Sequence, residues 1–229
     1  MNPSAMKVSS RSGHRISSIK PNTTSAVQVR AQRRALFTTL QGMGSRIVSK
    51  LLFIVSRFNR LAWGYVNPSR PQGVLAAGLE NGELALWDPE KILAGADASE
   101  SLILRNTIHT GPVRGLDFNP IQSNLLASGG IGGEVYIWDL KDPSKPYTPT
   151  PGSTSTKLDE ITSVAWNQQV QYVLAGASST GYTVVWDLRG KREVVALAYT
   201  GPGNAVQGNR KGMSSIAWHP NNVRLLLVG

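Results

Sequence analysis

The residues that most often carry chemistry are few and widely spaced in this chain. Its three histidines, His14, His109 and His219, do not stand at metal-ligand spacing, and there is no cysteine. Asp159 and Glu160 are adjacent carboxylates with no histidine or serine placed to complete an acid–base or nucleophilic set. We therefore expect no catalytic residue, no metal site and no cofactor, and we expect that the chain is not an enzyme.

A glycine-rich run, GGIGG at residues 129–133, would cradle a phosphate group only if a helix followed it. The next residues read EVYIWD, which is the pattern of a strand. We therefore expect a hairpin turn here and not a nucleotide-binding loop.

A Trp-Asp dipeptide occurs three times, each time at the end of a short apolar run that follows a glycine-containing turn. Four further runs end in the aromatic residues Trp63, Phe118, Trp166 and Trp218, which are 55, 48 and 52 residues apart. This period is slightly longer than the roughly 40–45 residues of a WD repeat. The pattern predicts an all-β fold, an incomplete WD-repeat β-propeller. We expect three four-stranded blades, at about 57–107, 108–158 and 159–200, and the start of a fourth at 212–229.

Tryptophan suits the wedge between two blades because it is large and apolar, while its N–H needs a buried polar partner. In WD repeats, which this pattern resembles, the residues that form the polar network with the tryptophan are His, Ser or Thr, and Asp. The second unit has His109 and Ser128, but Ile131 and glycines stand where the turn often holds Asp; Gly78 replaces the serine in the first unit, and Asp159 lies near the histidine position of the third. The structural WD positions are therefore predicted to be Trp87, Asp88, His109, Ser128, Trp138, Asp139, Trp186 and Asp187.

The net charge of +10 is distributed unevenly. Twelve of the 24 basic residues lie at or before Arg70, whereas the first acidic residue is Glu80. From Glu80 onward, twelve basic and fourteen acidic residues nearly cancel. The propeller region therefore lacks the basic face of a nucleic-acid-binding domain, and we expect no nucleic-acid partner. No run of residues is long and apolar enough to span a bilayer.

Residues 1–56 are free of acidic residues and differ from the rest of the chain. Their beginning is rich in Ser and Arg, so we expect disorder. Farther on, apolar residues recur every three or four positions and predict an amphipathic helix; they are Leu36, Leu40, Met43, Ile47, Leu51, Ile54 and Phe58. Three interpretations are open for this segment: unrelated sequence joined through an error in the gene structure, a mitochondrial transit peptide, or an arm that lies on an anionic membrane.

The amino-acid sequences of the units, loops included, are more specific than those of a generic WD repeat. Stretches such as FNRLAWG, GVLAAGLENGELALWDPEKIL, HTGPVRGLDFNPIQSNLLASGGIGGEVYIWDL and LDEITSVAWNQQVQYVLAGASSTGYTVVWDLRGKREVVALAY closely resemble the propeller of the large, rod-forming subunit of the COPII outer coat, in particular its fungal forms. The resemblance covers about residues 56–228. It implies a scaffold on the cytoplasmic face of endoplasmic reticulum exit sites and of COPII vesicles. Its implied partners are the smaller WD-repeat outer-coat subunit and the inner coat with its small GTPase, with membrane association through the coat.

The chain departs from that family in three respects. The basic segment stands where a blade's worth of family sequence is expected, the chain stops within the fourth unit, and the rod, the donated blade and the Pro-rich GTPase-stimulating region are not present in it. Rod pairing and GTPase stimulation therefore do not carry over. The alternatives are a WD-repeat adaptor in a ubiquitin ligase or signalling complex and a glycosidase-like propeller that uses Asp159 or Glu160. Because three and a half blades cannot close a ring, we expect exposed apolar end faces and low stability of the chain alone.

Overall fold

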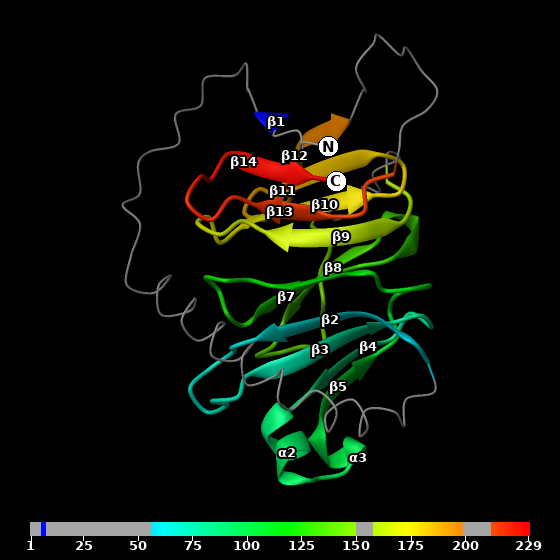
Figure 1. The fold of residues 1–229 in the computed structure, drawn as a ribbon, viewed down its shortest axis with the longest axis vertical. Coiled ribbons are helices and arrows are strands. Elements are labelled where there is room, and N and C mark those ends of the chain that lie inside the picture. The colour runs from blue at the N-terminus through cyan, green and yellow to red at the C-terminus, as the bar shows by residue number, and fades with distance from the viewer. Residues whose placement is uncertain (1–5, 8–55, 150–157, 199–211) are drawn as a thin grey trace.

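Four antiparallel sheets follow one another along the chain and stack face to face (Figure 1). The computed structural model describes residues 6–7, 56–149, 158–198 and 212–229. The predicted disorder and the predicted amphipathic helix lie for the most part outside the described residues. Two described stretches contradict them, because Met6 and Lys7 form a short strand and Phe58, the last residue of the predicted helical stripe, begins a strand of the first sheet. Within the described residues, the predicted all-β, propeller-type fold is confirmed.

The strands of the four sheets are hydrogen-bonded in sequence order within each sheet, with one exception. The first sheet contains β2 (Phe58–Gly64), β3 (Val74–Leu79), β4 (Leu84–Trp87) and β5 (Leu102–Asn106). The second contains β6 (Gly115–Phe118), β7 (Leu125–Gly129) and β8 (Val135–Asp139). The third contains β9 (Ile161–Trp166), β10 (Val173–Ser178), β11 (Tyr182–Asp187) and β12 (Arg192–Ala198). The exception is the fourth, where β13 (Ile216–Trp218) and β14 (Leu225–Val228) are joined by β1 (Met6–Lys7), which pairs with the free edge of β14.

The second sheet differs from the predicted four strands. Its fourth position is reduced to a single bridge between Tyr147 and Ile137, with backbone N···O distances of 2.8 and 3.0 Å. Pro146 and Pro149 flank this bridge and cannot donate backbone hydrogen bonds to a neighbouring strand. The prolines thus explain why the outer strand does not extend.

Two short helices interrupt the first sheet between β4 and β5, where the sequence pattern predicts strands and turns alone. They are α2 (Pro89–Ala94) and α3 (Ala98–Ser101). Asp88 caps α2 by accepting a hydrogen bond from the backbone N–H of Glu90 at 3.0 Å, and Pro89 occupies the first turn. Gly95 ends the helix with φ of 96°, a conformation that side chains other than glycine rarely adopt. The Trp-Asp dipeptide therefore also starts a helix in this unit.

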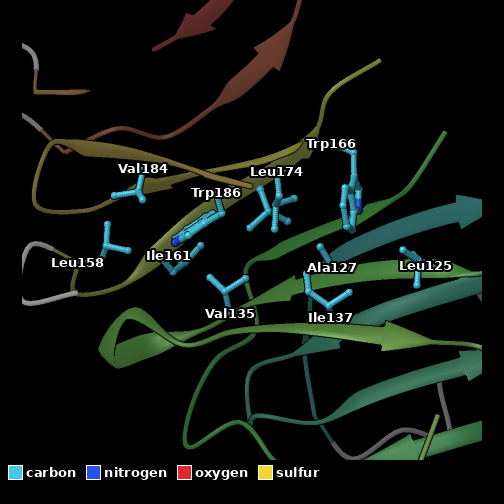
Figure 2. Packing of buried hydrophobic residues seen from close by; sticks show 11 residues of the cluster. Leu125, Ala127, Val135, Ile137, Leu158, Ile161, Trp166, Leu174, Val184 and Trp186 are labelled. Atoms are coloured by element: carbon cyan, nitrogen blue, oxygen red, sulfur yellow. The ribbon is translucent and has the colours of Figure 1, made fainter. Parts of the chain in front are cut away.

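Alternation along the strands gives each sheet two apolar faces, and facing sheets bury them against each other. We call these three buried interfaces the seams. The seam between the first and second sheets contains Leu84, Leu86, Phe118, Leu126 and Trp138. The seam between the second and third contains Val135, Ile137, Ile161, Leu174 and Trp186, whose facing side chains are shown in Figure 2. The seam between the third and fourth contains Ala175, Val185, Leu226, Ile216 and Trp218.

Candidate functional site

The tryptophans of the three Trp-Asp dipeptides are all buried at the ends of third strands. Each side chain points to the side of the preceding sheet. Trp138 therefore packs in the first seam and Trp186 in the second. Trp87 lies on the far face of the first sheet, in a cluster with Leu75 and Ala85. The three positions are equivalent in their sheets, but two of them lie in seams between described sheets.

A buried polar network surrounds Trp138 in the second sheet. Its indole N–H donates to the hydroxyl oxygen of Ser128 at 2.8 Å, and that hydroxyl lies 2.7 Å from Nε2 of His109. Nδ1 of His109 lies 3.0 Å from a carboxylate oxygen of Glu134, which fixes the ring proton on Nδ1. Ser128 then donates to Nε2 and accepts from Trp138, so every polar atom in the chain of bonds is paired.

Glu134 is the member of this network that the sequence interpretation missed. Its carboxylate also accepts hydrogen bonds from the backbone N–H and the hydroxyl of Thr110, at 3.1 and 2.7 Å. It therefore takes the place of the turn aspartate, from a position four residues before Trp138 and not from the turn itself. Burial lowers the pKa of His109 below its ordinary value, although the contact with Glu134 acts in the opposite direction.

The first and third sheets lack this network. Strand register pairs Trp138 with Leu126, Trp186 with Leu174 and Trp87 with Leu75. The residue two places after the paired leucine is Ser128 in the second sheet, Gly176 in the third and Ala77 in the first. The sequence interpretation assigned Gly78 to this position in the first sheet, which was wrong by one residue. At Gly176 a Cβ atom would lie 2.8 Å from the ring of Trp186, so the indole fills the space that a serine needs.

The aspartates of the three dipeptides share one local role, which is to close the turn after the third strand. Each accepts a hydrogen bond at 3.0 Å from the backbone N–H two residues later. Asp139 also accepts from the side chain of Asn124 at 2.8 Å, and this bond is the main reason why its pKa lies below the usual value. Burial works against the charge of Asp187, but its hydrogen bonds with Arg189 lower the pKa overall.

Three kinds of hydrogen bond recur across the seams. In the first kind, a backbone N–H at the start of one sheet donates to a backbone carbonyl of the preceding sheet. The donor–acceptor pairs are Val113–Leu79 at 3.0 Å, Ile161–Gly130 at 2.8 Å and Met213–Ser178 at 3.0 Å. These bonds fix the position of each sheet along its neighbour.

The second kind uses the tryptophans that end the innermost strands. The indole N–H of Trp166 donates to the backbone carbonyl of Asp117, and that of Trp218 donates to the carbonyl of Ala165, both at 3.0 Å. Each acceptor is the residue before the strand-end aromatic of the preceding sheet. These tryptophans, and not only those of the dipeptides, therefore join blades.

The third kind runs in the opposite direction, from an asparagine that follows the strand-end aromatic. Asn119 donates to the carbonyl of Gln171 at 2.7 Å, and Asn167 donates to the carbonyl of Val223 at 3.0 Å. The side-chain oxygen of each asparagine also accepts two backbone N–H groups of its own turn. The signal was visible as an aromatic-Asn pair in two units, but its partner lies more than fifty residues away.

Two further positions that the sequence analysis singled out, residues 131–133 and His219, lie in turns. Residues 131–133 form a single 3-10 turn between β7 and β8, as expected of a hairpin. His219 lies in a turn, where its Nδ1 accepts from the backbone N–H of Asn221 at 3.1 Å. Among the described residues there is no cluster of three or more His, Cys, Asp or Glu side chains that could hold a metal ion. Nor does any helix in this part of the chain have the length and apolar character needed to cross a membrane.

The repeated sheets, their Trp-Asp ends and their hydrogen-bonded seams define a WD-repeat β-propeller segment. Residues 101–139 match the family model described as "WD domain, G-beta repeat". A chain of a solved mitotic checkpoint complex shares the fold, with a TM-score of 0.56 and 20% identity over 76% of this chain and 44% of that chain.

Within that class, this chain belongs to the Sec31 family. It is 63% identical over 186 residues to "Protein transport protein SEC31" of Mycosarcoma maydis, and 44% identical over 168 residues to Sec31A of Homo sapiens. These matches cover 76% and 72% of this chain but 13% of each relative, so the chain spans a small part of the relatives' length. A solved chain from "COPII on membranes, outer coat vertex" matches with a TM-score of 0.57 and 28% identity, over 76% of this chain and 56% of that chain.

Proposed function

We propose that this chain is a structural part of a COPII-type vesicle coat in transport from the endoplasmic reticulum to the Golgi. The observation that carries the proposal is the 63% identity to a SEC31 protein over 186 residues. The similarity to a chain of a COPII outer coat vertex supports the same role.

The geometry supports a scaffold and not a catalyst. Four side chains that could act as acids, bases or ligands serve as hydrogen-bonding partners inside blades and turns. His109 and Glu134 bond to each other in the network around Trp138, and Asp139 and Asp187 close turns. The seams join successive sheets at several points, which favours presenting loops and outer strands as a fixed surface. We infer that the chain acts by protein–protein contact and has no enzymatic activity.

The proposed partners are the other COPII subunits, namely the smaller WD-repeat outer-coat subunit and the inner coat with its small GTPase. Association with the membrane is then peripheral and runs through the coat. The proposed location is the cytoplasmic face of endoplasmic reticulum exit sites and vesicles. The relatives named above give no support to a mitochondrial location.

Reconstitution of the coat on liposomes tests the proposal. Purified inner coat, its GTPase held in the GTP state and the smaller outer-coat subunit are bound to liposomes, and the chain is added. We expect it to float with the liposomes when all coat subunits are present, and to stay unbound when they are omitted. A WD-repeat protein of similar length from a ubiquitin ligase serves as the control. Equal recovery of the chain and this control would reject the coat role.

A further inference from the structure

The third sheet ends in a strand whose outer edge is open within the described residues. β12 pairs with β11 on one side, and the described part of the chain places no strand on its other side. It has seven residues, whereas the outer strand of the first sheet, β5, has five and that of the second is a single bridge. An open edge presents backbone N–H and C=O groups to which a further strand can bond.

The backbone groups of Ala196 face this open edge. β11 bonds to β10 through Leu188, whose N–H donates to the carbonyl of Tyr172, and through every second residue before Leu188. The residues between these bond to β12, where their partners are Val195 and Leu197. Because Ala196 lies between the two partners, its N–H and C=O point away from β11.

A basic turn leads into the edge. Three of the four exposed residues 189–192 are basic, namely Arg189, Lys191 and Arg192. The guanidinium of Arg189 stacks on Tyr172, 3.4 Å from the ring centroid, and bonds to Asp187 at 3.3 Å. Within the described residues, Lys191 and Arg192 form no ion pair, so the turn keeps two uncompensated positive charges.

This charge is particular to the third sheet. In the connection that follows the Trp-Asp dipeptide of the first sheet, residues 89–101 carry one lysine against three carboxylates. In the second sheet, residues 140–146 carry two lysines against one carboxylate. Residues 188–192 carry three basic residues and no acidic one. The repeat pattern therefore does not explain the basic turn.

Lys191 has a backbone conformation that suits glycine better. Its φ is 47°, and among the described residues it is the only residue other than glycine with a positive φ. Glycine would adopt this conformation without strain, because it has no Cβ atom. Strained residues of this kind cluster at sites that bind ligands. Here the strained residue carries a positive charge beside the open edge of β12.

An apolar side chain is exposed on the same strand. The register of β11 and β12 shifts by one residue at Val194, which is therefore the extra residue of a bulge. Val194 is 54% exposed, whereas Val195 and Leu197 pack in the seam between the third and fourth sheets. From the turn onward, β12 thus offers positive charge, an apolar contact and outward-facing backbone groups.

We propose that the edge of β12 binds an extended acidic segment of another protein as an additional strand. Carboxylates of this segment pair with Lys191 and Arg192, an apolar side chain covers Val194, and backbone groups bond to Ala196. The same edge of a second copy is a poor partner, because it brings positive charges together. A nucleic acid or an anionic membrane needs a wider basic surface than one turn. The inference goes beyond the coat role and does not depend on it.

The test uses a fluorescein-labelled synthetic peptide of about eight residues, the length of an ordinary strand. It consists of alternating valine and threonine and ends in a run of glutamates, an order that brings the glutamates to the basic turn when the peptide lies antiparallel to β12. We expect the full chain to bind it with a Kd of about 10–100 µM by fluorescence anisotropy. Amide hydrogen exchange at Ala196 should slow in the complex, a readout that needs no variant. A peptide with proline in place of each threonine keeps the charge but cannot pair as a strand, so it should bind at least about tenfold more weakly.

A double variant tests the charge. Lys191→Gly with Arg192→Gln removes both uncompensated charges and keeps the turn, since glycine accepts the φ of 47°. Binding should weaken about fivefold or more, as expected when two exposed ion pairs are lost. The matched control is Lys141→Gln with Lys145→Gln, which removes two exposed charges from the equivalent connection of the second sheet and should change the Kd less than about twofold.

Four results would overturn the proposal. They are no binding of the acidic peptide at about 1 mM, equal binding of the proline peptide, equal effects of the two double variants, and unchanged exchange at Ala196 in the complex. Tighter binding of phosphatidylserine vesicles or of a single-stranded oligonucleotide than of the peptide, lost in the Lys191→Gly, Arg192→Gln variant, would assign the turn to a polyanion and would also overturn it. Circular dichroism of each variant verifies that the sheets are retained.

Discussion

Replacement of Ser128 by alanine should destabilise the second sheet far more than the loss of one hydroxyl suggests. Ser128 accepts from Trp138 and donates to His109, and all three side chains are buried. The variant leaves an indole N–H and an imidazole nitrogen without partners. Each buried polar group left unpaired costs about 1–3 kcal/mol, so the free energy of unfolding should fall by about 2–6 kcal/mol in total.

Urea unfolding followed by tryptophan fluorescence measures this loss. With a slope of about 2 kcal/mol per molar urea, the midpoint should fall by about 1–3 M at an unchanged slope. Ser144→Ala is the matched control, because Ser144 is exposed and bonds only to the side chain of Asp142 among the described residues, at 2.6 Å. Its midpoint should move by less than about 0.25 M, as expected of a surface substitution.

The third sheet has a tryptophan at the equivalent position without a serine partner. There the same position is Gly176, and the ring of Trp186 lies against it without a serine. If Ser128→Ala shifted the midpoint by less than about 0.3 M, Trp138 would tolerate the loss in the same way as Trp186. The reasoning that assigns stability to the His109–Ser128–Trp138 network would then be refuted.

Three further predictions concern the network and the seams. Because burial lowers the pKa of His109 from 6.5, the unfolded chain binds its proton first, so stability should fall as pH drops below about 6.5; His109→Gln should flatten this dependence in urea midpoints measured from about pH 8 to about pH 5.5. Asn167→Asp keeps the turn acceptor but loses the donor to Val223, and should cost about 1–3 kcal/mol and speed hydrogen exchange in β14 but not in the turn after Asn167; equal acceleration in both would contradict the seam assignment. Gly64→Ala places a Cβ 2.3 Å from the ring of Phe118 and should cost about 1–3 kcal/mol in thermal or urea unfolding; Phe118→Leu in the same chain should recover part of the loss, and no recovery would argue against this clash.

Local features of the molecule could be predicted from the sequence because their partners are close along the chain. Glycine-containing hairpin turns, strand-end aromatics and the aspartates that follow tryptophan act within a few residues. Asp139 closes its own turn with the N–H of Lys141. His109, Ser128 and Trp138 belong to one repeat, and hydrogen bonds join them. The helices α2 and α3 were missed because a repeat pattern sets the expectation of strands, whereas Pro89 and Gly95 favour a helix locally.

The sequence by itself determined the period, most of the strands and the positions of the buried tryptophans, because these depend on alternation and on turns. Only the tertiary structure decided which polar groups meet across the seams. Asn167 and Val223 are 56 residues apart, and no local pattern states that one donates to the other. The same holds for Glu134, which replaces an absent turn aspartate by reaching His109 from 25 residues away. The pairs across the seams form only after sheets have stacked, since stacking removes water from these groups and leaves the neighbouring blade as their partner.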